Sequence, residues 1–243
     1  MSSGMDELIA VRVFRGDDRA GAWCSYRVPR QESQTVLDVV TWIQRNAEPA
    51  LAYRFACRVG MCGSCAMTVN GEPRWTCRTH VRNVAADNRL EIAPLRNLPV
   101  IKDLVTDMTE FFEKWTRAKA VFEPSATRAD PLPLISPEGE QRKAASEGIE
   151  CINCAVCYAA CDTVRQHAGY LGPAALNRAW TLVNDERDAG NRARLAAVTG
   201  PEGCTSCHSH QSCQKYCPNE LNPTAAIAGL KRKAAAAYLR GGR

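Results

Sequence analysis

The sequence predicts an α+β protein in which a mixed region of strands and helix precedes an all-helical region. Strand-like segments and hairpin turns are confined to the first ~100 residues, whereas helix-like segments dominate from about residue 140. A stretch with several prolines and no clear periodicity, residues 123–139, separates the two. We therefore expect three parts, at residues 1–105, 106–139 and 140–243.

The N-terminal part contains two hairpin signals and one helix. Thr35 can cap the helix, and Asn70-Gly71 is a tight turn between two strands. This order of strand, strand, helix, loop and strands is typical of a ubiquitin-like β-grasp domain. The expected elements are strands at 8–14 and 22–28, a helix at 36–47, a hairpin within 65–75, and a last strand at 89–95.

Helical segments follow the sheet region. Two of them open with proline at the first helical position, after Gly172 and Asn222, which is a common helix start. No strand signal is found after about residue 140. The helices that we expect are 101–122, 173–188 and 223–239.

Composition and charge exclude some classes of function. The net charge of +5 is spread along the chain without a strongly basic block, which argues against a nucleic-acid partner. No apolar run reaches about 18 residues, and the N-terminus has no signal-peptide pattern. We therefore expect a reducing compartment, with any membrane role supplied by a partner.

Thirteen cysteines, an odd number in tight clusters, favour metal binding over disulfides.

The first cysteine group has the spacing C-x4-C-x2-C-x11-C. This matches the plant-type [2Fe–2S] loop with its distant fourth cysteine. Gly60 and Gly63 allow a sharp turn that points backbone amides at the sulfurs. Zinc is the alternative, but zinc sites favour paired C-x2-C motifs and only one occurs in this half. The expected [2Fe–2S] ligands are Cys57, Cys62, Cys65 and Cys77.

The run CINCAVCYAAC has the C-x2-C-x2-C-x3-C spacing of bacterial ferredoxins, whose fourth cysteine ligates another cluster. A second run in this register needs cysteine at 207, 210, 213 and 217, but position 210 is histidine. Cross-ligation then predicts one complete site and one with three thiolates, which suits [3Fe–4S]. The [4Fe–4S] ligands would be Cys151, Cys154, Cys157 and Cys217, and the [3Fe–4S] ligands Cys161, Cys207 and Cys213.

His210 leaves two interpretations open. It can fill the empty corner beside a [3Fe–4S] cluster, which we favour, or it can ligate a fourth iron, since imidazole replaces thiolate in some centres. Cys204 lies outside the register and is interpreted as a spare thiol that could compete for the site.

These motifs define the fold class and a family resemblance. The sequence predicts an N-terminal β-grasp plant-type ferredoxin domain, a helix with a proline-rich connector, and an all-helical bacterial ferredoxin-like domain. The segments CRVGMCGSCAMTVNG, ECINCAVCYAAC, YLGPAALNRAWTLVNDERD and CPNELNPTAAI occur in this order. Over nearly the whole chain, this resembles the iron–sulfur subunit of succinate dehydrogenase and fumarate reductase, respiratory complex II.

The resemblance implies a function. Such a subunit passes electrons between the FAD of a flavoprotein subunit and a quinone at a membrane subunit, through the [2Fe–2S], [4Fe–4S] and [3Fe–4S] clusters in turn. It implies a cytochrome b-type anchor with haem b on the partner, and a peripheral location on the cytoplasmic face of the inner membrane. It also implies no catalytic residue in this chain, which would be an oxidoreductase subunit of the tricarboxylic acid cycle without substrate chemistry of its own.

Three polar residues are expected near the quinone. Asp162 follows Cys161 where the ferredoxin run and many relatives have proline. His210 stands where the family usually has an apolar residue, and its titration could assist quinone protonation. His208 matches a histidine that some relatives place near the quinone and the cluster, with a structural hydrogen bond as the alternative.

Two other functions are compatible with the same motifs. The chain could serve a soluble fumarate reductase or another flavin-dependent dehydrogenase, although such relatives often carry further cysteine-rich modules. It could also be a free ferredoxin-type carrier. The length, the proline-rich connector and the positive charge argue against a free carrier, since small carriers are commonly acidic.

Overall fold

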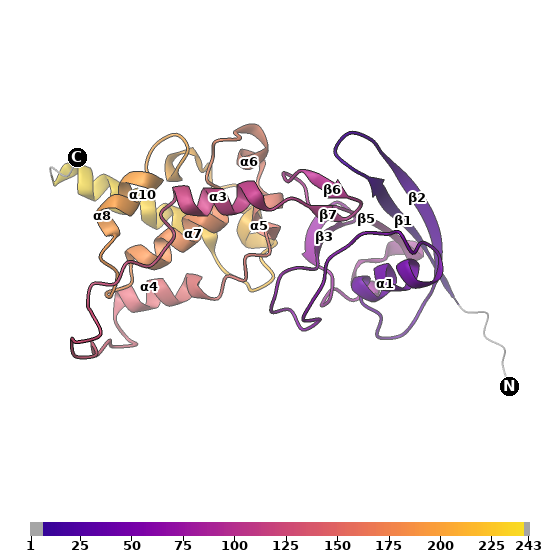
Figure 1. The fold of residues 1–243 in the computed structure, drawn as a ribbon, viewed down its shortest axis with the longest axis horizontal. Helices are drawn as coiled ribbons and strands as arrows, with labels where there is room; N and C mark the ends of the chain where they lie inside the picture. Colours follow the sequence, from indigo (N-terminus) through magenta and orange to yellow (C-terminus); the bar gives the residue numbers. More distant parts are fainter. Residues whose placement is uncertain (1–6, 241–243) are drawn as a thin grey trace. The chain divides into compact units, whose positions relative to one another are not determined.

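The computed structural model describes residues 7–240 and divides the chain into two compact units. The first unit contains Met1–Met108 and Ile152–Ala159, and the second contains Thr109–Cys151 and Ala160–Arg243. A sheet characterises the first unit and helices the second (Figure 1). The coarse α+β organisation is therefore confirmed, whereas the domain boundaries at 105 and 140 stay predictions.

The sheet of the first unit has the strand order β2-β1-β5-β3-β4. Its two hairpins, β1 with β2 and β3 with β4, are antiparallel as predicted, and β1 pairs with β5 in parallel. Asn70 and Gly71 have φ values of 49° and 82°, which the tight turn requires. The strands are β1 Leu8–Gly16, β2 Gly21–Pro29, β3 Ala66–Val69, β4 Glu72–Trp75 and β5 Arg89–Ala93.

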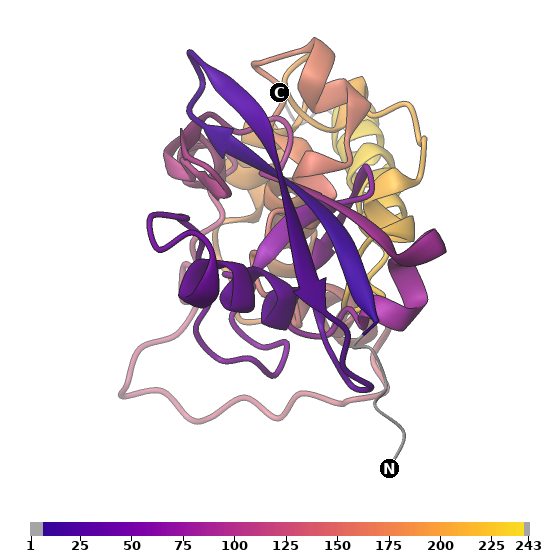
Figure 2. The ribbon, with the colours of Figure 1, turned by 90° about the vertical axis from the view of Figure 1, so that its right-hand side faces the viewer.

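Helix α1, Val36–Asn46, packs its apolar side on this sheet (Figure 2). Val36, Val40 and Ile43 are fully buried among strand residues. Thr35 and Asp38 form a capping box, in which the Asp38 amide donates to Thr35 Oγ1 at 3.2 Å and the Thr35 amide donates to Asp38 Oδ2 at 3.0 Å. The predicted helix and its cap are confirmed.

The segment after β5 differs from the prediction. The strand expected at 89–95 is present as β5, but it is not the last strand of the chain. Of the helix expected at 101–122, only α3, Thr109–Arg117, is helical. A small hairpin of β6, Val100–Lys102, and β7, Val105–Thr106, precedes it. The cause is Asp103, 2% exposed, whose carboxylate accepts hydrogen bonds from the Gly16 and Ala52 amides and pairs with Arg15. These tertiary contacts hold the chain in a turn that helical periodicity does not reveal.

The second unit is built around helix α7, which packs against α3, α4, α8 and α10. The expected helix at 223–239 is confirmed as α10, where Asn222 Oδ1 accepts from the Ala225 amide at 2.9 Å. The expected helix at 173–188 ends at Val183. Helices of this unit are α4 Glu140–Ile149, α6 Asp162–Gln166, α7 Gly172–Val183, α8 Asn191–Val198, α9 Ser212–Lys215 and α10 Pro223–Leu239.

Shorter helical segments complete the structure. In the first unit these are α2 Val81–Val84, the 3₁₀ turn η1 Ala86–Asn88, and α5 Val156–Ala159. In the second unit, η2 is Cys204–Ser206. Over residues 7–240, no helix combines the length and apolar character needed to cross a bilayer.

A buried ion pair explains why α7 stops early. Arg194 on α8 and Asp188 in the loop between α7 and α8 have fully buried side chains and form two hydrogen bonds, at 2.7 and 3.0 Å. Arg194 also donates to the carbonyls of Lys119 and Val121, at 2.9 Å each. The pair therefore ties the segment after α3 to the α7–α8 loop, and pulls residues 184–188 out of the helix.

Replacement of Arg194 by alanine should strongly destabilise the second unit. The change leaves the Asp188 carboxylate buried without its cation, which costs about 3–5 kcal/mol. Arg192→Ala is the matched control, because Arg192 lies exposed on the same helix and should cost under about 1 kcal/mol. Urea denaturation of both variants measures the difference, and equal midpoints would contradict a structural role for the pair.

Candidate functional site

Three cysteines of the first group lie in the loop that connects α1 to β3, and Cys77 follows β4. The sulfur of Cys57 accepts hydrogen bonds from the amides of Val59, Met61 and Cys62, at 3.4, 3.3 and 3.3 Å. The Cys77 amide donates to Cys65 Sγ at 3.5 Å, and the Cys57 amide to Cys62 Sγ at 3.5 Å. Amides directed at sulfurs are what an anionic iron–sulfur cluster requires of its loop.

Two glycines allow the tight turns of this loop. Gly60 and Gly63 have φ values of 79° and 70°, which side chains rarely tolerate. A Cβ at Gly63 would lie 2.8 Å from both Cα and Cβ of Cys154, and a Cβ at Gly60 would lie 2.8 Å from the Trp75 ring. Both positions therefore need glycine for conformation and for space.

The four thiols differ in how readily they ionise. A hydrogen bond from Ser64, together with the Cys57 amide, lowers the pKa of the exposed Cys62 to about 6. Burial raises the pKa of Cys77 to about 12, and the neighbouring Cys65 adds to the shift. A buried pair of thiols of this kind becomes anionic when cationic iron is close. The donor set thus fits a [2Fe–2S] cluster.

A second group of three cysteines lines one hollow in the second unit. Cys161 caps the start of α6, Cys207 follows η2, and Cys213 lies in α9. Burial raises the pKa of Cys161, and raises that of Cys213 to about 11. Lys231 on α10 donates to the Cys207 carbonyl at 2.7 Å and so anchors its loop. The three predicted [3Fe–4S] ligands are therefore brought together.

Polar residues share this hollow. Asp162, His208 and His210, the residues predicted to lie near a quinone, all line it. The histidine rings lie 6.1 Å apart, and both side chains are exposed. Asp162 pairs with Arg165 at 3.1 Å. Cys204, by contrast, is fully buried and is not among the described residues that line the hollow.

The four cysteines predicted to hold [4Fe–4S] fall in both units. Cys154 and Cys157 belong to the first unit, whereas Cys151 and Cys217 belong to the second. Within the second unit, Asn219 Nδ2 donates to the Glu150 carbonyl at 2.7 Å, next to Cys151 and Cys217 in sequence. The [4Fe–4S] ligand set stays a prediction. In residues 7–240, no three His, Cys, Asp or Glu side chains are arranged to hold a single metal ion.

The sequence did not predict that Tyr170 also lines this hollow. Tyr170 is 1% exposed, and burial, together with the nearby Cys207, raises the pKa of its phenol. Its segment, YLGPAAL, is otherwise apolar, and a single phenol in such a run was the available signal.

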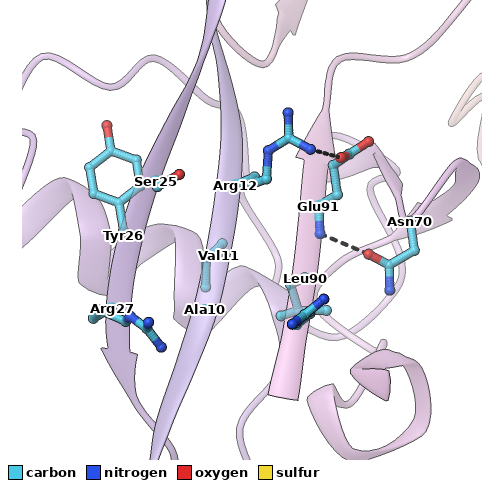
Figure 3. Close-up of a pocket in the computed structure, with 10 residues that line it drawn as sticks. Ala10, Val11, Arg12, Ser25, Tyr26, Arg27, Asn70, Leu90 and Glu91 are labelled. Atoms are coloured by element: carbon cyan, nitrogen blue, oxygen red, sulfur yellow. Dashed lines mark hydrogen bonds and ion pairs between the residues drawn. The ribbon is translucent and has the colours of Figure 1, made fainter. Parts of the chain in front are cut away.

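A larger hollow, of about 630 Å³, lies on the open face of the sheet (Figure 3). Arg12, Arg27 and Arg89 line it without any cysteine, and Arg12 pairs with Glu91 at 3.0 Å. It contains no cysteine that could hold a cluster, so the volume of a hollow does not identify the functional site of this protein.

Gly63→Ala should prevent assembly of the [2Fe–2S] cluster. The added methyl group would lie 2.8 Å from Cys154, and the left-handed φ of residue 63 disfavours any side chain. Gly71→Ala is the matched control: its φ is also positive, at 82°, but a Cβ there has no neighbour within 4 Å. The control should cost only about 1 kcal/mol and keep its cluster. Visible absorption and reduced-state electron paramagnetic resonance measure the cluster. Equal cluster content in both variants would refute the steric argument.

Comparisons with known proteins agree with the geometry. Residues 9–113 match the family model of a 2Fe-2S iron-sulfur cluster binding domain, and residues 150–222 match that of a 4Fe-4S dicluster domain. The fumarate reductase iron-sulfur subunit of Haemophilus influenzae is 34% identical over 225 residues, which cover 88% of this chain and 87% of that protein. The succinate dehydrogenase iron-sulfur subunit of Paracoccus denitrificans is 36% identical over 199 residues, which cover 81% and 74%.

A solved structure shows the same fold. A chain of the Mycobacterium smegmatis Sdh1 complex in the apo form matches with a TM-score of 0.84 and 29% identity, over 95% of this chain and 97% of that one. The domain matches account for [2Fe–2S] and [4Fe–4S] clusters, and a [3Fe–4S] cluster is typical of such subunits. The chain belongs to the family of iron–sulfur subunits of succinate dehydrogenase and fumarate reductase.

Proposed function

We propose that this chain relays electrons between the FAD of a flavoprotein subunit and a quinone held by a cytochrome b-type membrane anchor. The hollow of Cys161, Cys207 and Cys213 carries the proposal, because three thiols and three polar side chains share it. In this assignment the first unit is a β-grasp plant-type ferredoxin domain and the helical part is a bacterial ferredoxin-like domain. The chain itself lies peripherally on the cytoplasmic face of the inner membrane, and haem b belongs to the anchor.

The cysteines are assigned to clusters by their spacing and by the gathering of each group. The iron–sulfur clusters supply one-electron transfer, and the protein holds their thiolates and limits access of water. We assign Cys57, Cys62, Cys65 and Cys77 to [2Fe–2S], Cys151, Cys154, Cys157 and Cys217 to [4Fe–4S], and Cys161, Cys207 and Cys213 to [3Fe–4S].

The surface of the first unit supports a protein partner at its cysteine loop. Phe55, Val59 and Met61 are 40%, 60% and 69% exposed beside Cys57 and Cys62. Large apolar side chains gathered at one place are typical of a surface that a partner covers. We assign the flavoprotein to this loop, where the exposed Cys62 lies nearest to solvent.

The other hollow supports proton chemistry beside the last cluster. Quinone reduction consumes protons, and His208 and His210 each offer an imidazole nitrogen that can carry one. Asp162 is half-exposed and paired with Arg165 at the rim of the hollow. Proline at position 162 would remove this carboxylate.

Co-purification tests the assignment. The tagged chain, extracted with mild detergent from cells that make it, should bring an FAD-containing flavoprotein and a b-type cytochrome, with succinate-dependent quinone reduction. Recovery of a lone soluble iron–sulfur protein would contradict the proposal and favour a free carrier.

Cys213→Ala should abolish quinone reduction and leave succinate oxidation with an artificial soluble acceptor, because electrons would still reach the earlier clusters. Cys204→Ala is the control, since Cys204 is a buried thiol of the same segment that does not line the hollow. The Cys204→Ala variant should keep at least about half of the quinone-reduction activity, because the change only leaves a small cavity that lowers stability. Loss of quinone activity in both variants, with normal iron content in Cys213→Ala, would reject this ligand set.

A further inference from the structure

We infer that the Tyr170 hydroxyl donates a hydrogen bond to the sulfur of Cys207 in the loaded protein, and thereby raises the reduction potential of the [3Fe–4S] cluster. The inference rests on the proposed assignment of Cys207 to this cluster. Tyr170 is a positioning residue in this account, because it acts through a ligand and need not touch the quinone.

The phenol is fixed where it can act. Tyr170 is 1% exposed and lines the same hollow as Cys161, Cys207 and Cys213. Its amide donates to the His167 carbonyl at 3.0 Å, and the next amide, of Leu171, donates to the Glu202 carbonyl at 2.8 Å. These two bonds hold the backbone at the start of α7, so the ring has little freedom to leave the sulfur.

The hydroxyl acts as a donor. The ordinary pKa of a tyrosine phenol, about 10, lies well above neutral pH. The phenol therefore stays protonated at neutral pH. A buried hydroxyl without a partner is unfavourable, and the Cys207 sulfur in the same hollow is an available acceptor.

The consequence for the cluster follows from charge. Reduction adds an electron that spreads onto the sulfurs, so a proton donor at one sulfur stabilises the reduced state more than the oxidised state. Hydrogen bonds to sulfurs are among the factors that set the potentials of iron–sulfur clusters. The low dielectric of a buried site strengthens this effect.

Tyr170→Phe in the purified complex tests the inference, since it removes one oxygen and keeps the ring. A redox titration, monitored by the paramagnetic signal of the oxidised cluster, should show a more negative midpoint potential. At a fixed potential, the ratio of oxidised to reduced cluster should change about tenfold, which corresponds to 59 mV for one electron. Tyr53→Phe is the control: its hydroxyl donates to Thr41 Oγ1 at 3.2 Å in the first unit. The control should leave this midpoint unchanged.

A second variant keeps the test decisive if the phenylalanine protein fails to load the cluster. 3-Fluorotyrosine at position 170 is a stronger donor of similar size, and should shift the midpoint in the positive direction. An unchanged midpoint in both variants, with the signal present, would overturn the inference. So would normal midpoints with slowed quinone reduction, because the phenol would then serve the quinone. Absence of the signal from the unaltered complex would instead refute the proposed ligand set.

Discussion

The second unit depends on one constraint, the cost of placing negative charge on three sulfurs in a protein interior. Burial raises the pKa of Cys161 and Cys213, so these thiols stay protonated at neutral pH in the absence of metal. Iron must supply the positive charge that makes them ligands, and metal binding then releases protons and stabilises the fold. The surrounding structure brings the three sulfurs to one hollow. Helices α6 and α9 each carry one cysteine, and Lys231 on α10 fixes the loop of the third.

The cysteine loops carry backbone conformations that side chains disfavour. Among the described residues, twelve non-glycine residues have positive φ, and five of these lie within one or two residues of cysteines in the cluster segments. They are Arg58, Asn153, Ala155, Ser209 and Gln211. Each left-handed residue costs of order 1 kcal/mol, which the rest of the fold must offset. Such turns direct successive amides into a concavity and so suit an anionic group. The amides around Cys57 show this arrangement.

Sequence reasoning was most successful where chemistry imposes a spacing. A cluster admits few loop lengths, so the intervals between cysteines predict the ligand sets. The structure brings Cys161, Cys207 and Cys213 of one such set to a common hollow. Capping residues predicted α1 and α10 for the same local reason. The β6–β7 hairpin and the early end of α7 could not be predicted, because they depend on buried carboxylates, Asp103 and Asp188, whose partners are distant in sequence. Tyr170 was missed because only the folded chain brings it to the same hollow as Cys207, which lies thirty-seven residues later.

The central claim, that three thiolates and no fourth ligand hold the last cluster, is tested most directly by electron paramagnetic resonance of the purified, air-oxidised complex. An oxidised [3Fe–4S] cluster is paramagnetic, whereas oxidised [2Fe–2S] and [4Fe–4S] clusters are silent. The account predicts a sharp signal in the oxidised sample, with His210 as a neighbour of the cluster. A silent oxidised sample that contains the full iron of three clusters would contradict it, and would mean that a fourth ligand is present, with His210 or Cys204 as the first residue to replace.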